Sequence, residues 1–109
     1  MTYEEIFNKV KAEFGKADVS DIKEHLAYQF NIVGEGEGIF YAEVRDGQLY
    51  IEPYEYYDRD AIFICTAEVL FKIMAGKMDP VKAFLVQKLH VEGNIDKALL
   101  LKEMIKNQK

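Results

Sequence analysis

Cysteine and positive charge are both scarce in this chain of 109 residues. Cys65 is the only cysteine, so neither an intramolecular disulfide nor a cluster of thiolate metal ligands can form. The 14 lysines and arginines are outnumbered by 19 acidic residues, which gives a formal net charge of −5. Because phosphate contacts need clustered basic side chains, this balance argues against a nucleic-acid partner and gives no reason to expect strong attraction to anionic membranes.

Long apolar runs and a secretory signal are missing as well. No run approaches the roughly 18 residues that span a bilayer, and residues 1–5 are acidic rather than basic and then apolar. We therefore expect a cytoplasmic protein without stable membrane insertion. The chain is 50% hydrophobic and 30% charged, as in ordinary globular proteins, and its length fits one domain over residues 1–109.

The spacing of apolar residues predicts several helices. A three- and four-residue spacing indicates an amphipathic helix over residues 3–14, with Thr2 and Glu5 as its capping box. Thr66 is expected to cap a second helix, and Asp-Pro at 79–80 is a good start for a third. The helices expected from these signals begin at residues 3, 67, 80 and 95, and the last one runs to residue 106.

Alternation of apolar and polar residues predicts strands between the first two helices. Asp46-Gly47 is a strong signal for a two-residue hairpin turn, and Pro53 is expected to end a strand. Because strands and helices are grouped along the chain rather than strictly alternating, the predicted class is α+β. The expected strands cover residues 26–32, 40–44, 49–51, 60–65 and 89–91.

Three segments carry a resemblance to a known family. Residues 60–66 form an apolar strand that leads into a helix, and the helix ends at Gly-Lys-Met-Asp-Pro, residues 76–80. Lys-Leu-His-Val-Glu-Gly-Asn follows at 88–94. This arrangement resembles the sterol carrier protein 2 (SCP-2) domain family, over nearly the whole chain. The departures are Gln87 in place of glycine, Asn94 in place of aspartate, isoleucines in place of two strand threonines, and the absence of the usual tryptophan.

The resemblance implies a five-stranded, mainly antiparallel sheet in the order 3-2-1-4-5, covered on one face by helices. It also implies a hydrophobic cavity between the two layers. Members of the family bind sterols, fatty acids, acyl-coenzyme A or phospholipids and use no metal or catalytic group. We therefore expect non-catalytic binding or transfer of an apolar ligand, without a cofactor.

The parity of the strands assigns one sheet face to the interior, and no charged residue falls on that face. An apolar ligand suits such a face, although a filled core would be lined by the same residue types. Tyr28 and Gln87 are the candidates with polar tips, and Tyr28 could bond a ligand head group or merely a backbone carbonyl. The candidate ligand-binding residues are Tyr28, Phe30, Phe40, Val44, Ile51, Phe63, Ile73, Met74, Phe84, Gln87, Leu101, Met104 and Ile105.

Other chemistry finds little support. His25 and His90 fall on the outer side of their strands without nearby cysteines, which makes a poor metal site. Cys65 follows an apolar strand and is expected to be an inert buried thiol. The glycines at 34–38 alternate with glutamates, which repel phosphate, so a flexible turn is the better interpretation than a nucleotide loop.

The outer sheet face is more apolar than a face turned toward water should be. Contiguous apolar surface usually marks a contact, so we predict a homodimer through this face. Scattered surface aromatics beside Glu43, Arg45 and Glu52 are the competing explanation. The residues expected at the dimer interface are Tyr41, Tyr50, Ile62 and Ile64.

Three functions remain open at this point. The first is a lipid-binding or lipid-transfer module. The second is a structural or dimerisation module that keeps the fold but fills the cavity with large side chains. The third is a small enzyme, which would need an acidic residue on the inner face, and a shift of strand register by one residue would create that situation.

Overall fold

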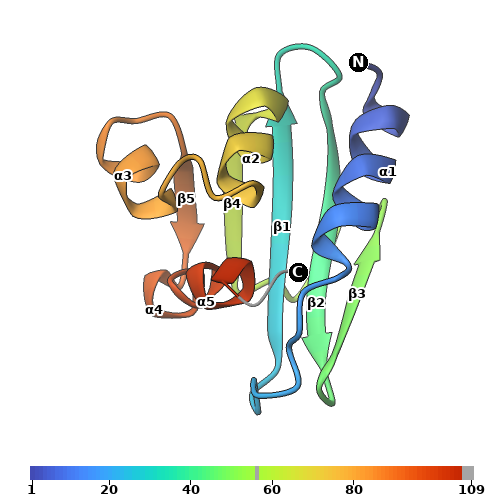
Figure 1. Ribbon diagram of the computed structural model, residues 1–109, viewed down its shortest axis with the longest axis vertical. Coiled ribbons are helices and arrows are strands. Elements are labelled where there is room, and N and C mark those ends of the chain that lie inside the picture. The colour runs from blue at the N-terminus through green and yellow to red at the C-terminus, as the bar shows by residue number, and fades with distance from the viewer. Residues whose placement is uncertain (56, 107–109) are drawn as a thin grey trace.

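The computed structural model of the protein describes residues 1–55 and 57–106, and it consists of a sheet with helices packed in front of it (Figure 1). The strands are β1 (Leu26–Val33), β2 (Gly38–Arg45), β3 (Gln48–Glu52), β4 (Ala61–Thr66) and β5 (His90–Gly93). The helices are α1 (Tyr3–Phe14), α2 (Ala67–Met74), α3 (Pro80–Leu85), α4 (Ile95–Ala98) and α5 (Leu100–Lys106).

The five strands form one sheet in the order β3-β2-β1-β4-β5. Only the central pair, β1 with β4, is parallel, and the other three pairs are antiparallel. This confirms the α+β class and the strand order that the sequence predicted. Since β3 and β4 lie on opposite sides of β1, the segment that joins them has to cross the sheet, and in Figure 1 it passes behind it.

Helix α1 begins as the sequence predicted. Thr2 accepts a hydrogen bond from the backbone of Glu5, and the Glu5 carboxylate accepts one from the Thr2 backbone at 2.8 Å. The apolar side of α1 packs on the sheet, where Phe7 meets Phe40 edge to face. Gly38 lies directly under the ring of Tyr3, so a side chain at this position would overlap the ring. The glycine-rich turn therefore also makes room for the start of α1.

An aromatic row fills the core between α1, α2 and the sheet. Phe40, Phe30 and Phe63 stack across β2, β1 and β4 with ring centroids 5.0 and 5.2 Å apart. Tyr28 meets Phe63 edge to face at 5.2 Å. All four side chains are buried, and no charged residue of the described chain lies on this inner face. The predicted strand parity is therefore confirmed.

Positive backbone φ angles occur at the predicted hairpin turn and at the end of β5. Asp46 and Gly47 both have positive φ, 54° and 74°, as a two-residue hairpin with primed geometry requires. Gly93 has φ of 100°, and a Cβ there would approach the Asp60 carbonyl oxygen to 2.6 Å. Glycine is therefore needed at the end of β5, where the strand meets the start of β4.

The last helix differs from the prediction of one continuous helix over 95–106. It is divided into α4 and α5 at Leu99, although the Leu99 backbone remains right-handed helical with φ of −64° and ψ of −23°. The Lys102 amide donates to the Leu99 carbonyl oxygen at 3.2 Å, a bond over three residues instead of four. The interruption is therefore a local tightening, and apolar spacing alone does not indicate it.

Candidate ligand cavity

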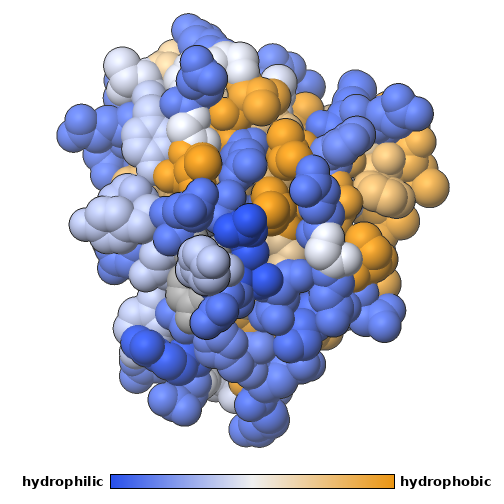
Figure 2. All heavy atoms as spheres, turned by 180° about the vertical axis from the view of Figure 1, so that it is seen from behind, coloured by the Kyte–Doolittle hydropathy of each residue, from blue (hydrophilic) through white to orange (hydrophobic). Residues whose placement is uncertain are grey.

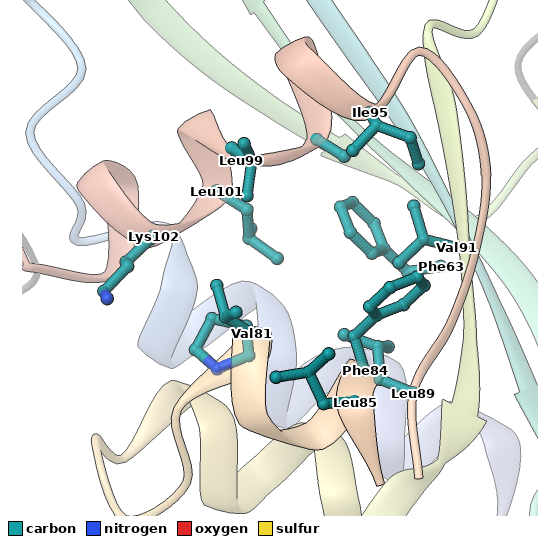
Figure 3. A pocket seen from close by; sticks show the side chains of 12 residues that line it. Phe63, Val81, Phe84, Leu85, Leu89, Val91, Ile95, Leu99, Leu101 and Lys102 are labelled. Atoms are coloured by element: carbon teal, nitrogen blue, oxygen red, sulfur yellow. The ribbon is translucent and has the colours of Figure 1, made fainter. Parts of the chain in front are cut away.

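A cavity of about 230 Å³ lies at the end of the molecule where α3, α4 and α5 face the β4–β5 pair. Figure 3 shows side chains from both helical walls and from the two strands pointing into one common space. Apart from Lys102, every lining residue is apolar. The lining consists of Phe63, Pro80, Val81, Phe84, Leu85, Leu89, Val91, Ile95, Ala98, Leu99, Leu101 and Lys102.

The wall formed by α3 is fixed by Asp79. Its carboxylate caps α3 by accepting the Val81 amide at 2.8 Å, and Pro80 occupies the first turn, where a missing amide hydrogen costs nothing. This backbone hydrogen bond, followed by the contact with Lys102, lowers the pKa of Asp79. Since the Lys102 ammonium lies 3.4 Å from the Asp79 carboxylate, the pair joins α3 to α5 beside the cavity.

The opposite wall, α4, is held from below by Asp60 and Tyr28. Lys97 of α4 places its ammonium 3.2 Å from one Asp60 oxygen, while the other oxygen accepts the Ala27 amide at 2.8 Å. The Tyr28 hydroxyl donates to the Lys97 carbonyl oxygen at 2.5 Å. Burial, and then the nearby charges of Asp60 and Glu24, raise the pKa of Tyr28. Of the two partners that the sequence left open for Tyr28, the structure has the backbone carbonyl.

The predicted ligand-binding residues divide into three groups. Phe63, Phe84 and Leu101 border the cavity. Gln87 follows α3 with an exposed side chain and a positive φ of 63°, in an open groove beside α2 rather than at this cavity. The others pack in the core under α1, α2 and α5, where Phe30, Ile73 and Met74 line a void of about 10 Å³. These are Tyr28, Phe30, Phe40, Val44, Ile51, Ile73, Met74, Met104 and Ile105.

Several cavity residues were not predicted from the sequence, among them Val81, Ile95 and Lys102. The apolar run at residues 83–86 is the sequence signal for this wall, because it gives a short helix an unusually apolar surface. The sequence could not predict that Lys102 lies opposite Asp79. The two residues are separated by 22 others and meet only through the packing of α5 against α3.

The outer sheet face carries an apolar group that we call the outer patch. Ile39 and Ile64 flank Asn31 from the two neighbouring strands, and Ile62 lies beside Gln29 in the next row. Figure 2, which views this side, shows hydrophobic atoms gathered over the upper part of the face among hydrophilic ones. The outer patch consists of Val33, Ile39, Ile62 and Ile64, of which Val33 and Ile39 are exposed.

The two tyrosines predicted at the same interface do not belong to the outer patch. Tyr50 lies away from it, and Tyr41 lies beside its edge. Tyr50 is on edge strand β3, stacked under the Arg45 guanidinium at 4.5 Å. Tyr41 lies between Gln29 of β1 and Glu52 of β3 in the strand register. All four predicted interface residues are half-buried in the chain.

The outer face also holds buried polar side chains that sequence parity placed in solvent. Glu43 is only 4% exposed, and its carboxylate lies 2.6 Å from Nε2 of His25. Gln29 is 2% exposed and donates to Asn31 at 2.8 Å. His25 itself is exposed, as expected of a surface histidine, and its ring pairs with the buried Glu43 carboxylate.

The remaining reactive groups form no site in the part of the chain that is described. Burial raises the pKa of Cys65 to about 12, so its thiol is protonated and unreactive at neutral pH. Residues 1–55 and 57–106 contain no group of three or more His, Cys, Asp or Glu side chains placed to hold a metal ion. Within the same residues, every helix is too short or too polar to cross a membrane.

The fold and the cavity together define a class: an α+β domain that encloses an apolar pocket between its sheet and its C-terminal helices. The chain matches the SCP-2 sterol transfer family over residues 7–106 and belongs to that family. Hydroxysteroid dehydrogenase-like protein 2 of Rattus norvegicus is 30% identical over 79 residues. The matched region is 72% of this chain and 15% of the rat protein, so the chain spans a small part of this relative.

Solved structures show the same fold. A sec-alkylsulfatase from Pseudomonas sp. superposes with a TM-score of 0.72 and 17% identity over 86% of this chain and 14% of the sulfatase. Sterol carrier protein 2 of Aedes aegypti, solved in complex with palmitate, superposes with a TM-score of 0.65 and 19% identity. That alignment covers 100% of this chain and 98% of the mosquito protein.

Proposed function

We propose that this chain binds the acyl chain of a fatty acid, or of a similar single-chain lipid, in the cavity between α3, α4, α5 and the β4–β5 pair. The observation that carries the proposal is a space of about 230 Å³ whose lining is apolar except for Lys102. An aliphatic chain suits this lining because each buried methylene contributes about 0.8 kcal/mol. The mosquito protein with palmitate supports the same ligand class.

The size of the cavity favours one chain over two. A methylene group is about as large as a water molecule, whose share of liquid volume is about 30 Å³. The space therefore holds about eight methylene groups without rearrangement. A longer chain would extend through the mouth between α3 and α4, or would separate these short helices.

Lys102 is the natural contact for a carboxylate head group. Of the described residues that line the cavity, it alone is charged, and its ammonium is directed away from the apolar walls toward the edge of the cavity in Figure 3. Its present partner, Asp79, competes for the same ammonium at 3.4 Å. A fatty acid would thus be held with its tail inside and its carboxylate at the rim.

Binding or transfer without catalysis is part of the proposal. Among residues 1–55 and 57–106, the lining includes no histidine, cysteine, serine, tyrosine or carboxylate that could act as a nucleophile or a general base. The polar cluster of Glu43 and His25 lies on the opposite face of the sheet and cannot reach a ligand in the cavity.

Displacement of a fluorescent fatty acid tests the cavity. Val91 lines the cavity from β5, and Val91→Trp should fill part of the space and weaken binding at least tenfold. His90 is the matched control, because it precedes Val91 on the same strand and faces the other side of the sheet. His90→Trp should bind like the wild type. Native mass spectrometry of the purified wild type should detect a bound lipid. A protein that carries no lipid and does not bind the fluorescent fatty acid would refute the proposal.

One observation favours the second candidate, a structural module with a filled core. The aromatic row of Phe40, Phe30 and Phe63 occupies the central space between sheet and helices, and the void beside Phe30 measures about 10 Å³. The same experiment distinguishes the two candidates. A module with a filled core should not bind the fluorescent fatty acid, and Val91→Trp and His90→Trp should then give the same result as the wild type.

We also propose that the chain forms a homodimer through the outer patch. The patch spans β2, β1 and β4 around Asn31, and its two exposed members, Val33 and Ile39, are larger apolar groups than a sheet face in water usually presents. This face is separate from the cavity, so pairing there leaves the proposed ligand site open.

A further inference from the structure

Leu101 of α5 borders two separate spaces in the layer between the sheet and the helices. It lines the cavity of about 230 Å³ and also the void of about 10 Å³ under α1 and α2. Among the described residues, it alone lines both. The side chain is buried, and in Figure 3 it extends from its helix toward the middle of the cavity. Leu101 thus belongs to the partition between the open end and the packed end of this layer.

Two stacked rings of the aromatic row form the other part of this partition. Phe63 lines the cavity and Phe30 lines the void, and their ring centroids lie 5.2 Å apart. Phe30 also stacks on Phe40. Phe63 also meets the ring of Tyr28 edge to face. The rings therefore support one another, whereas Leu101 is a single aliphatic side chain on a short helix and is the part of the partition that one substitution can open.

We infer that Leu101 closes the inner end of the cavity and so makes the protein selective for fatty acids with about eight methylene groups. The inference rests on the proposed function, because it names the class of fatty acid that the cavity takes. Neighbouring residues of α5 then define the two ends of the ligand, Lys102 the carboxylate and Leu101 the end of the tail. A longer chain cannot pass Leu101, so its additional methylene groups remain in water at the mouth and contribute little to binding.

The size of the Leu101 side chain determines how much room its removal would create. Leu101→Ala deletes three carbon atoms, which is room for about three methylene groups. Because Leu101 borders both spaces, the cavity of this variant would also become continuous with the void under α1 and α2. Each additional methylene group that leaves water should raise the affinity about fourfold. The variant should therefore accept longer fatty acids than the wild type does.

Displacement of a fluorescent fatty acid by saturated fatty acids of increasing length tests the inference. For the wild type, the affinity should rise about fourfold per methylene group up to nonanoate, and dodecanoate should then bind within about threefold of nonanoate. For Leu101→Ala the rise should continue, so dodecanoate should bind at least about tenfold more tightly than nonanoate. Leu101→Val removes a single carbon atom and should extend the rise by about one methylene group, which tests the inference if Leu101→Ala does not fold.

Leu70→Ala is the matched control. Leu70 of α2 and Leu101 are equally buried, with 4% exposure each, but Leu70 lines the void and not the cavity. The control deletes the same atoms and should lower stability in a similar way, while Leu101 still closes the cavity. Its dependence of affinity on chain length should therefore equal that of the wild type. Circular dichroism verifies that the variants are folded.

The outcomes distinguish this inference from the proposed function. A wild-type affinity that keeps rising up to dodecanoate would overturn the inference. Wild-type length dependence in folded Leu101→Ala and Leu101→Val, or the same shift in Leu70→Ala as in Leu101→Ala, would also overturn it. In all these cases the protein still binds fatty acids. Failure of the wild type to bind the fluorescent fatty acid would instead overturn the proposed function, and this inference with it.

Discussion

At the scale of single residues, Lys102 decides between a cavity for any apolar molecule and a cavity for a fatty acid. Lys102→Gln should weaken the affinity for a fatty acid about fivefold, because an exposed ion pair contributes up to about 1 kcal/mol. The affinity for the fatty alcohol of the same chain length should stay unchanged, since it has no carboxylate. Competition assays with both ligands measure the difference, and an equal loss for acid and alcohol would contradict the assigned role.

Tyr28 carries a second prediction at this scale. Its hydroxyl bonds the Lys97 carbonyl oxygen, so Tyr28→Phe should destabilise the fold by about 1 kcal/mol. For a domain of this size that corresponds to a decrease of roughly 4–8 °C in Tm. The affinity for a fatty acid should change less than twofold, whereas a residue that bonds the head group would show a larger loss. Tyr50→Phe, which removes a hydroxyl bonded to the exposed Gln48 side chain, should leave Tm almost unchanged.

Sequence parity was sufficient to place residues on the two faces of the sheet, but it could not locate the cavity. Tyr28, Phe30 and Phe63 all point inward as predicted, yet only Phe63 reaches the cavity. Residues on one face share the same hydrophobic pattern whether they meet another side chain or an empty space. The exposure of Leu85 and Leu99 depends on how the short helices are arranged, which no local pattern encodes.

At the scale of helices and strands, local signals were reliable where a side chain satisfies its own neighbouring backbone. The caps at Thr2, Thr66 and Asp79 all accept the hydrogen bonds that the sequence predicted. The division of the last helix at Leu99 was missed because it depends on a shift of one hydrogen bond rather than on a change of residue type. Capping patterns are contained within four residues, while helix irregularities are not.

Asp79 links a capping signal to the cavity, and its titration gives a prediction. Asp79→Ala should lower stability at pH 7, because it removes both the α3 cap and the contact with Lys102. Asp79→Asn keeps a capping acceptor and should lower stability less. The folded-state pKa of Asp79 is lowered, so its contribution is present above the usual carboxyl pKa, about 4, and is lost as the pH falls through the lower folded value.

Urea unfolding of the wild type and both variants at pH 7 and near pH 3 measures this dependence. The difference between the wild type and Asp79→Ala should shrink on acidification. A difference that stays constant or grows would show that the carboxylate charge does not stabilise α3.

At the scale of the whole molecule, the two ends of the layer between sheet and helices differ in packing. Under α1 and α2 the aromatic row leaves almost no free volume, while under α3, α4 and α5 a cavity of about 230 Å³ remains. The helices around the cavity are short, with four to seven residues each, and such helices bury little area of their own. The filled end can therefore hold the fold while the other end opens to a ligand.

The outer patch and the cavity lie on opposite faces of the sheet, so pairing can be tested separately from ligand binding. We expect light scattering at micromolar concentration to give a mass near twice the 12.6 kDa of one chain. Ile39→Lys places a charge on the β2 side of the outer patch, next to Asn31, and should shift the equilibrium to the monomer because burying an unpaired ammonium is costly. Val86→Lys adds the same charge at the exposed end of α3 and should leave the mass unchanged. A wild type that stays monomeric at high micromolar concentration would show that the apolar outer face serves no self-association.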